Sequence, residues 1–222
     1  MHIYLYEPRP NAFRGLLTRL DEAQWDPVAV NDDLFDRELD LLGADGYADR
    51  PVLLAEHPRL VEHISRLRRS GCRNPILVLR VARDPEAAMD ALDAGADDDI
   101  VGPVTGLELR SRVNAITRRF HGHAAGTLRI GDITAYFDGR DPDVGGQPMK
   151  LSQRELAIFQ QIALAAPRVV SKSVIYDAVY GMAQDQPFDK VIDVYICRIR
   201  KKIEEMSASG DPHIRTIRGR GY

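Results

Sequence analysis

Four isoleucines in the last third of the chain constrain its fold most, because they recur at the spacing of one helix face. Ile192, Ile196, Ile199 and Ile203 follow one another at steps of four, three and four residues. Side chains at these steps lie on a single side of an α-helix, which can then be buried. Residues 188–202 are therefore predicted to form an amphipathic helix whose inner face packs on a core.

The opposite face of this helix combines apolar side chains with cations and carries no acid. Its members are Lys190, Val191, Val194, Cys197, Arg198 and Lys201. Such a surface suits a DNA major groove, because arginine can fork onto guanine, apolar groups can touch thymine methyls and cations can meet phosphates. A basic, solvated helix end would carry the same charges, since cations near a helix C-terminus are stabilising. The helix alone leaves both interpretations open.

Length and composition exclude several classes of protein. A chain of 222 residues that is 44% hydrophobic can build one or two ordinary cores. No run of about 18 apolar residues and no signal-peptide pattern is found, so we expect a soluble, cytoplasmic protein without a membrane segment. The spacings of the two cysteines, Cys72 and Cys197, and of the histidines His121 and His123 do not match those of a metal-binding site. We expect no metal, no cofactor and no catalytic set, and therefore no enzyme.

Charge is distributed unevenly along the chain. The formal net charge is −3, but residues 1–120 carry −5 whereas residues 121–222 carry +2. The two halves therefore present different kinds of surface, and only the second half suits a polyanion.

Short apolar runs alternate with helical patterns through residues 1–120. The strand candidates are 3–6, 51–55, 75–79 and 100–101. Strands that alternate with helices form a parallel sheet covered on both faces. We predict an α/β fold, a doubly wound parallel (βα)5 receiver-like domain over residues 1–120. A linker follows at 121–126, where small residues interrupt the pattern.

The order of these elements, PILVL at 75–79, GADDD at 95–99 and the basic helix end at 115–119 resemble the receiver domain of two-component response regulators. The resemblance implies acids that hold Mg²⁺ after the first strand and a phosphorylated Asp at the end of the third. It also implies a hydroxyl, an aromatic residue and a Lys that respond to the phosphate. This chain departs from the pattern at nearly all of these places.

Pro8 and Arg9 follow Glu7 where further acids are expected, and either Ala55 or Glu56 occupies the acceptor position. Three further replacements are Arg80 for the hydroxyl, Asp99 for the aromatic residue and Gly102 for the Lys. Magnesium needs several hard oxygen ligands, and phosphoryl transfer needs a nucleophile, which is missing here. We therefore predict a pseudo-receiver that is not phosphorylated. An alternative is that Glu56 imitates a phosphorylated Asp.

The face that relatives of the receiver class use to dimerise is retained. Its matching charges are Asp97, Asp98, Arg112, Arg118 and Arg119. A two-fold interface needs such a self-complementary set, so we predict a homodimer. The alternative is that these are ordinary surface charges, which contribute little.

Residues 127–222 are predicted to form an α+β winged helix-turn-helix. Short strand-like pieces between 128 and 151 indicate a small antiparallel sheet. Ser152 with Glu155 three residues later is a capping box, and Ser171 caps a second helix before the basic one. The ending HIRTIRGRGY at 213–222 predicts a hairpin that serves as the wing.

The motifs KLSQRELAIFQ, RVVSKSVIYDAVYG, IDVYICRIRKK and TIRGRGY resemble the DNA-binding domain of the OmpR/PhoB class of response regulators. Within that class, the Ile-Cys of DVYIC and the YGM loop are most similar to the CtrA subfamily of cell-cycle regulators. The resemblance implies double-stranded DNA as a partner. It also implies contact with RNA polymerase through the loop at 182–187.

The resemblance assigns DNA contacts residue by residue. Arg198 would contact a base, with Val191 and Val194 against thymine methyls, which favours AT-rich half-sites. Arg218 of the wing would enter the minor groove. The remaining residues would contact or flank the phosphate backbone: Lys190, Tyr195, Arg200, Lys201, Thr216, Arg220, Tyr180 and Lys172.

We therefore predict a sequence-specific DNA-binding transcription regulator that acts independently of receiver phosphorylation, as a homodimer. One alternative is a protein-interaction regulator that heterodimerises with another response regulator. Another is a module that senses a ligand or partner and binds DNA only secondarily. The sequence contains no pocket chemistry that would identify such a ligand.

Overall fold

The computed structural model describes residues 2–222 apart from 23–24, 37–38, 40–41, 43–49 and 181–189. Two compact units divide the chain, Met1–Thr117 and Arg118–Tyr222, which we call the first and second domains. Within the described residues, every helix is too short or too polar to span a bilayer.

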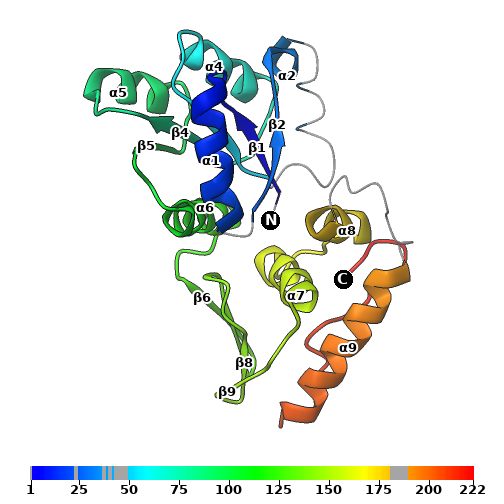
Figure 1. Ribbon diagram of the computed structural model, residues 1–222. Coiled ribbons are helices and arrows are strands. Elements are labelled where there is room, and N and C mark those ends of the chain that lie inside the picture. Colours follow the sequence, from blue (N-terminus) through cyan, green and yellow to red (C-terminus); the bar gives the residue numbers. More distant parts are fainter. Residues whose placement is uncertain (1, 23–24, 37–38, 40–41, 43–49, 181–189) are drawn as a thin grey trace. The chain divides into compact units, whose positions relative to one another are not determined.

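The first domain is a five-stranded parallel sheet with helices on both faces (Figure 1). Its strands lie in the order β2-β1-β3-β4-β5. They are β1 (His2–Tyr6), β2 (Asp26–Ala29), β3 (Val52–Ala55), β4 (Ile76–Arg80) and β5 (Asp98–Val101). The helices are α1 (Pro10–Glu22), α2 (Asp32–Asp36), α4 (Leu60–Arg69), α5 (Pro85–Asp93) and α6 (Gly106–Phe120).

Alternation along the strands divides the core between the two faces of the sheet. In β1, Ile3 and Leu5 pack with residues of α1 and α6, whereas Tyr4 and Tyr6 pack with residues of α2, α4 and α5. Successive strand residues point to opposite faces, so a sheet covered on both sides needs apolar residues at every position. The predicted doubly wound α/β fold is confirmed.

Two elements of this domain were not predicted, and the last strand begins two residues earlier than predicted. Both β2, with the polar-looking sequence DPVA, and the five-residue α2 are too short to carry a clear hydrophobic period. In addition, Asp98 and Asp99 are the first residues of β5, rather than residues before the last strand.

The second domain begins with an antiparallel sheet in the order β6-β7-β8-β9, followed by three helices. Its strands are β6 (Thr127–Ile130), β7 (Ile133–Tyr136), β8 (Asp143–Val144) and β9 (Gln147–Pro148). Its helices are α7 (Gln153–Ala165), α8 (Lys172–Tyr180) and α9 (Lys190–Met206). The wing is closed by an isolated antiparallel bridge between Ile217 and Gly221. The predicted α+β winged-helix class is confirmed.

The predicted helix starts are explained by their caps. Ser152 Oγ accepts from the Glu155 N–H, and the Glu155 side chain accepts from the Ser152 N–H at 2.8 Å, which completes the capping box. Ser171 Oγ accepts from the Val174 N–H at 3.2 Å. These bonds satisfy amide groups that the first helical turn leaves unpaired.

The predicted linker at 121–126 lies within the second domain, and its histidines are not free in solvent. His123 Nε2 lies 3.0 Å from the Leu164 carbonyl oxygen, and its ring stacks on Phe137 at 5.3 Å. His121 Nδ1 lies 3.2 Å from Arg168 Nη2. Residues far along the chain therefore fold back onto both histidines.

Candidate nucleic-acid interface and acceptor pocket

Helix α9 is anchored by the four isoleucines that the sequence singled out. Ile192, Ile196, Ile199 and Ile203 are at most 3% exposed and belong to the core of the second domain. The same core contains residues of α7 and α8, so these helices hold α9 in position. Burial of this face leaves the opposite face of α9 for a partner.

The outer face of α9 presents the mixture of apolar groups and cations that was predicted. Val194 is 48% exposed and Arg198 is exposed, with its guanidinium carbon 5.7 Å from the centre of the Tyr195 ring. The Lys201 side chain is 77% exposed. Val191 is half-buried against the core, so Val194 is the more accessible of the two valines. The Lys190 side chain and the loop at 182–187 lie outside the described residues.

Arg200 lies on the flank of α9 that faces the wing, and its guanidinium is already engaged. Nε donates to the Ile214 carbonyl at 2.9 Å, and Nη2 donates to Thr216 Oγ1 at 2.8 Å. Arg200 and Thr216 are each predicted to contact a phosphate. In the structure they bind each other and join α9 to the wing.

Asp193 is a functional residue that the sequence analysis missed. It accepts from Lys172 Nζ at 2.7 Å and from the Tyr222 hydroxyl, and the Lys172 ammonium is the main cause of its lowered pKa. Lys172 therefore connects α8 with α9 within the domain, besides any contact with DNA. An acid in the first turn of α9, ahead of the cations Arg198, Arg200 and Lys201, was the signal that could have identified this site.

The other predicted contacts are divided between surface and core. Arg218 and Arg220 are exposed on the wing, as is Arg215, which was not predicted. Tyr195 is half-buried. Tyr180 is only 9% exposed, stacks on Tyr176 at 4.9 Å and has a buried hydroxyl, so it is a core residue rather than part of the exposed surface.

In the first domain, a guanidinium lies beside Glu7 and Glu56, the acids at the acceptor pocket that the sequence predicts to be degenerate. Arg9 Nε and Nη2 donate to Glu7 at 2.8 and 2.9 Å, and Arg9 Nη1 lies 3.6 Å from Glu56 Oε1. Ala55 is the last, buried residue of β3, and Glu56 follows it. An arginine that pairs with both carboxylates opposes a divalent cation there, because like charges repel. The described residues include no group of three ligands that could hold a metal.

A buried ion pair occupies two positions at which the receiver resemblance predicts phosphate-responsive residues. Arg80 at the end of β4 donates through Nε to both carboxylate oxygens of Asp99 in β5, at 2.8 and 3.0 Å. Their side chains are 6% and 4% exposed, and Arg80 Nη2 also donates to the Ala87 carbonyl at 2.6 Å. Burial raises the pKa of Asp99, while the Arg80 guanidinium acts in the opposite direction.

Among the charges predicted to pair across a dimer axis, Asp97, Asp98 and Arg112 have partners within the chain. Asp97 accepts from Arg68 Nη2 at 2.8 Å and from the Ile76 N–H at 2.7 Å. Asp98 accepts from Arg112 Nη1 at 3.0 Å, and Arg112 also binds Glu108. Arg118 and Arg119 lie in the last turn of α6.

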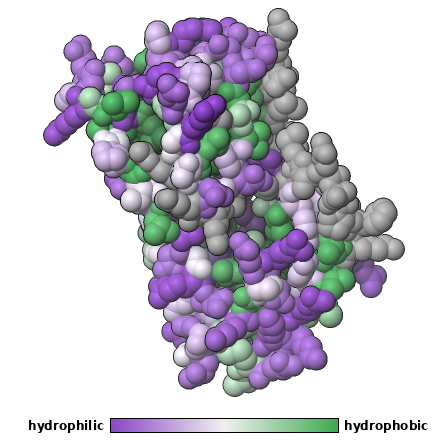
Figure 2. Space-filling view, viewed as in Figure 1, coloured by the Kyte–Doolittle hydropathy of each residue, from purple (hydrophilic) through white to green (hydrophobic). Residues whose placement is uncertain are grey.

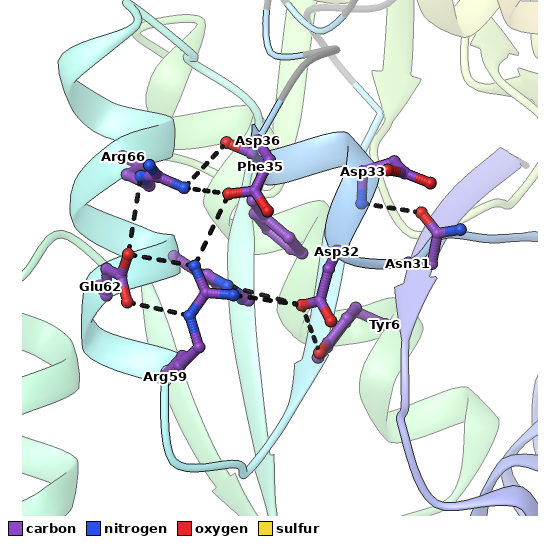
Figure 3. Close-up of polar contacts among 10 residues, drawn as sticks. Tyr6, Asn31, Asp32, Asp33, Phe35, Asp36, Arg59, Glu62 and Arg66 are labelled. Carbon is purple, nitrogen blue, oxygen red and sulfur yellow. Dashed lines mark hydrogen bonds and ion pairs between the residues drawn. The ribbon is translucent and has the colours of Figure 1, made fainter.

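A third polar cluster joins α2 to α4 next to the end of β1 (Figure 3). Arg59 and Arg66 of the α4 region pair with carboxylates of α2 and α4, and the Tyr6 hydroxyl donates to Asp32 at 3.0 Å. Beneath them, His63 is fully buried and its ring stacks on Phe35 at 3.9 Å. Burial lowers the pKa of His63 to about 4, and Arg59 and the protonated form of His57 lower it further, whereas Asp32 and Glu62 oppose this shift.

The buried histidine predicts acid sensitivity of the first domain. The pKa of His63 is about 4 in the folded chain and 6.5 in its ordinary state, so the unfolded chain binds the extra proton between these values. Stability should therefore rise with pH from 4 to 6.5 and then level off, by about 3 kcal/mol in total. Urea unfolding followed through Trp25, the single tryptophan and a buried residue of this domain, measures the effect. His63→Leu should flatten this rise, and an unchanged slope in that variant would contradict the assignment.

Comparisons with known proteins agree with this geometry. Residues 146–222 match the family "Transcriptional regulatory protein, C terminal". The cell cycle response regulator CtrA of Brucella anthropi is 35% identical over 161 residues, covering 72% of this chain and 68% of CtrA. CtrA of Brucella ovis is 34% identical over the same length. Among solved structures, the Thermotoga maritima response regulator DrrB has 22% identity and a TM-score of 0.41, covering 100% of this chain and 97% of DrrB.

Proposed function

This chain belongs to the OmpR/PhoB class of response regulators, and we propose that it controls transcription as a homodimer that needs no phosphorylation of its first domain. DNA binding and transcription regulation belong to the family. The proposal adds how the protein is controlled, which residues read the DNA and how two copies associate.

The observation that carries phosphorylation independence is the pair of guanidinium groups in the degenerate pocket. Arg9 pairs with Glu7 and Glu56 on the side where a metal would be held. Arg80 and Asp99 form a buried ion pair. Because the two charges neutralise each other, neither side chain needs to move to meet a phosphate. Phosphoryl transfer relies on cations placed around a nucleophile, and here the cations are paired with fixed carboxylates.

Treatment with acetyl phosphate and Mg²⁺ tests this part of the proposal. We expect intact-mass measurement to detect no phosphoryl adduct, because the described residues of the pocket offer neither an Asp nucleophile nor a metal site. Treated and untreated protein should sediment alike as dimers and bind DNA with equal affinity. An adduct, or a dimer that forms only after treatment, would overturn the proposal.

Dimerisation is supported by apolar side chains exposed on neighbouring elements of the first domain. Met89 and Leu92 of α5, Val101 of β5 and Leu107 of α6 are each at least 41% exposed. Figure 2 shows hydrophobic residues at the surface in the region of α5 and β5. A cluster of exposed apolar residues favours a protein interface, and the intrachain pairs of Asp98 and Arg112 would lie at its rim.

Arg198 is proposed to contact a base, with Val194 against a thymine methyl. Arg198→Ala should weaken binding to the preferred site by about 1–3 kcal/mol and blur the preference at one base pair. Lys201→Ala is the matched control, because a phosphate contact should weaken all sequences alike. Selection from random DNA followed by binding titrations on single-base variants measures both effects. Equal losses of affinity on every sequence for Arg198→Ala would assign Arg198 to the DNA backbone instead.

Contact with RNA polymerase through the loop at 182–187 stays a prediction.

A further inference from the structure

The two flanks of α9 face different parts of the second domain. On one flank, Arg200 binds the wing through Ile214 and Thr216. Tyr195 and Lys202 lie seven residues apart, close to two helical turns, and so share the other flank. Lys202 Nζ donates to the Lys150 carbonyl and to Glu155 Oε2, both at 2.9 Å. The Tyr195 flank therefore faces the start of α7.

A cation that the sequence analysis did not assign lies on this flank. Arg154, in the first turn of α7, is exposed, and its guanidinium carbon is 5.4 Å from the centre of the Tyr180 ring. A hydrogen bond with Arg154 is the main cause of the lowered pKa of Tyr195. Arg198 lies near the same tyrosine ring. Tyr195 is thus bounded by one guanidinium from α7 and one from α9.

Arg154 has donors that are free to bind an anion. Among the described residues, no carboxylate lies within ion-pair distance of Arg154. The Tyr180 hydroxyl is buried, and burial together with a hydrogen bond to Tyr195 raises the pKa of Tyr180 to about 12. An exposed guanidinium beside the Tyr195 hydroxyl suits a phosphodiester oxygen.

We propose that Arg154, with the hydroxyl of Tyr195, binds a DNA backbone phosphate on the flank of α9 opposite the wing. This assignment rests on the proposed DNA-binding surface and extends it to a third helix. The wing and α7 then bind the DNA backbone on either side of α9. Arg198 is left free to contact a base.

The salt dependence of binding tests the assignment. Arg154→Ala should weaken binding several-fold on preferred and scrambled sequences alike, and lower the slope of log K against log salt by about 0.9, the value for one phosphate. Arg140→Ala is a matched control, because Arg140 is also exposed and lies over a tyrosine ring, that of Tyr136, at 4.1 Å. It should leave the slope unchanged. Arg154→Lys should restore most of the slope.

A second readout separates phosphate binding from a purely structural function. Without DNA, Arg154→Ala should raise the pKa of Tyr195, followed as tyrosinate absorbance against a Tyr195→Phe reference. An unchanged salt slope in Arg154→Ala and Arg154→Gln would overturn the inference, as would a loss confined to one sequence. If the unaltered protein selects no preferred site from random DNA, the proposed base reading by Arg198 fails, whereas the Arg154 slope on non-specific DNA still decides the phosphate assignment.

Discussion

Arg80→Ala is expected to destabilise the first domain by about 3–5 kcal/mol, the largest single effect we anticipate. The substitution leaves the Asp99 carboxylate, whose side chain is 4% exposed, buried without its cation. Removing one partner of a buried pair costs this much because the remaining charge keeps its desolvation penalty. The Ala87 carbonyl would lose its donor as well. Urea unfolding followed through Trp25 reports on this domain alone.

The double variant Arg80→Met with Asp99→Leu separates charge from packing. Replacing both partners by apolar residues of similar size removes the unpaired charge, and such exchanges are often neutral or stabilising. We expect the double variant to recover most of the stability lost in Arg80→Ala. A loss below about 1 kcal/mol in Arg80→Ala, or a double variant as unstable as the single one, would show that the pair is not the buried constraint we describe.

Gly221→Ala is expected to detach the wing from the segment around Val170 in the same domain. A methyl group at this position would lie 2.0 Å from the Val170 carbonyl oxygen and 2.8 Å from Ser171 Cα, and φ is +134°. Neighbouring bonds join the Tyr222 and Val170 backbones in both directions, at 3.0 and 2.8 Å. Backbone strain of this kind costs about 1–3 kcal/mol, and the overlap with backbone atoms adds to it. DNA affinity should fall at least about tenfold, or 1.4 kcal/mol.

Gly219→Ala is the control for this prediction. Gly219 also has a positive φ, +71°, but a methyl group there meets nothing within 4 Å. The Gly219→Ala variant should lose about 1–2 kcal/mol of stability, the strain of a left-handed backbone at a residue with a side chain. The wing should stay in place. Thermal unfolding of both variants and titration with a preferred DNA site compare them. If Gly221→Ala behaves as mildly as Gly219→Ala, the wing is not held by this close backbone approach.

The sequence predicted those parts of the protein that depend on near neighbours along the chain. The four isoleucines of α9 and the Ser152–Glu155 capping box are confirmed, since helix periodicity and caps involve residues three or four apart. Alternating apolar runs likewise predicted the parallel sheet. The short elements β2 and α2 escaped prediction because four or five residues hold too little periodicity.

For the candidate sites, the sequence could identify residue types but not their partners. It placed Arg80, Asp99 and Arg9 at the degenerate positions, and it placed Arg198 and Val194 on the outer face of α9. It assigned Arg200 and Thr216 to DNA, whereas the structure joins them to each other. It also placed Tyr180 beside the DNA backbone, whereas only 9% of that residue is exposed.

The acceptor pocket and the flanks of α9 were therefore decided by tertiary structure alone. Arg80 and Asp99 are 19 residues apart and meet because β4 and β5 are paired in register. Asp193 meets Lys172 from another helix, 21 residues away. The sequence shows which side chains are charged, but the partner that neutralises each charge comes from a distant segment. Only the packing of strands and helices determines which segment that is.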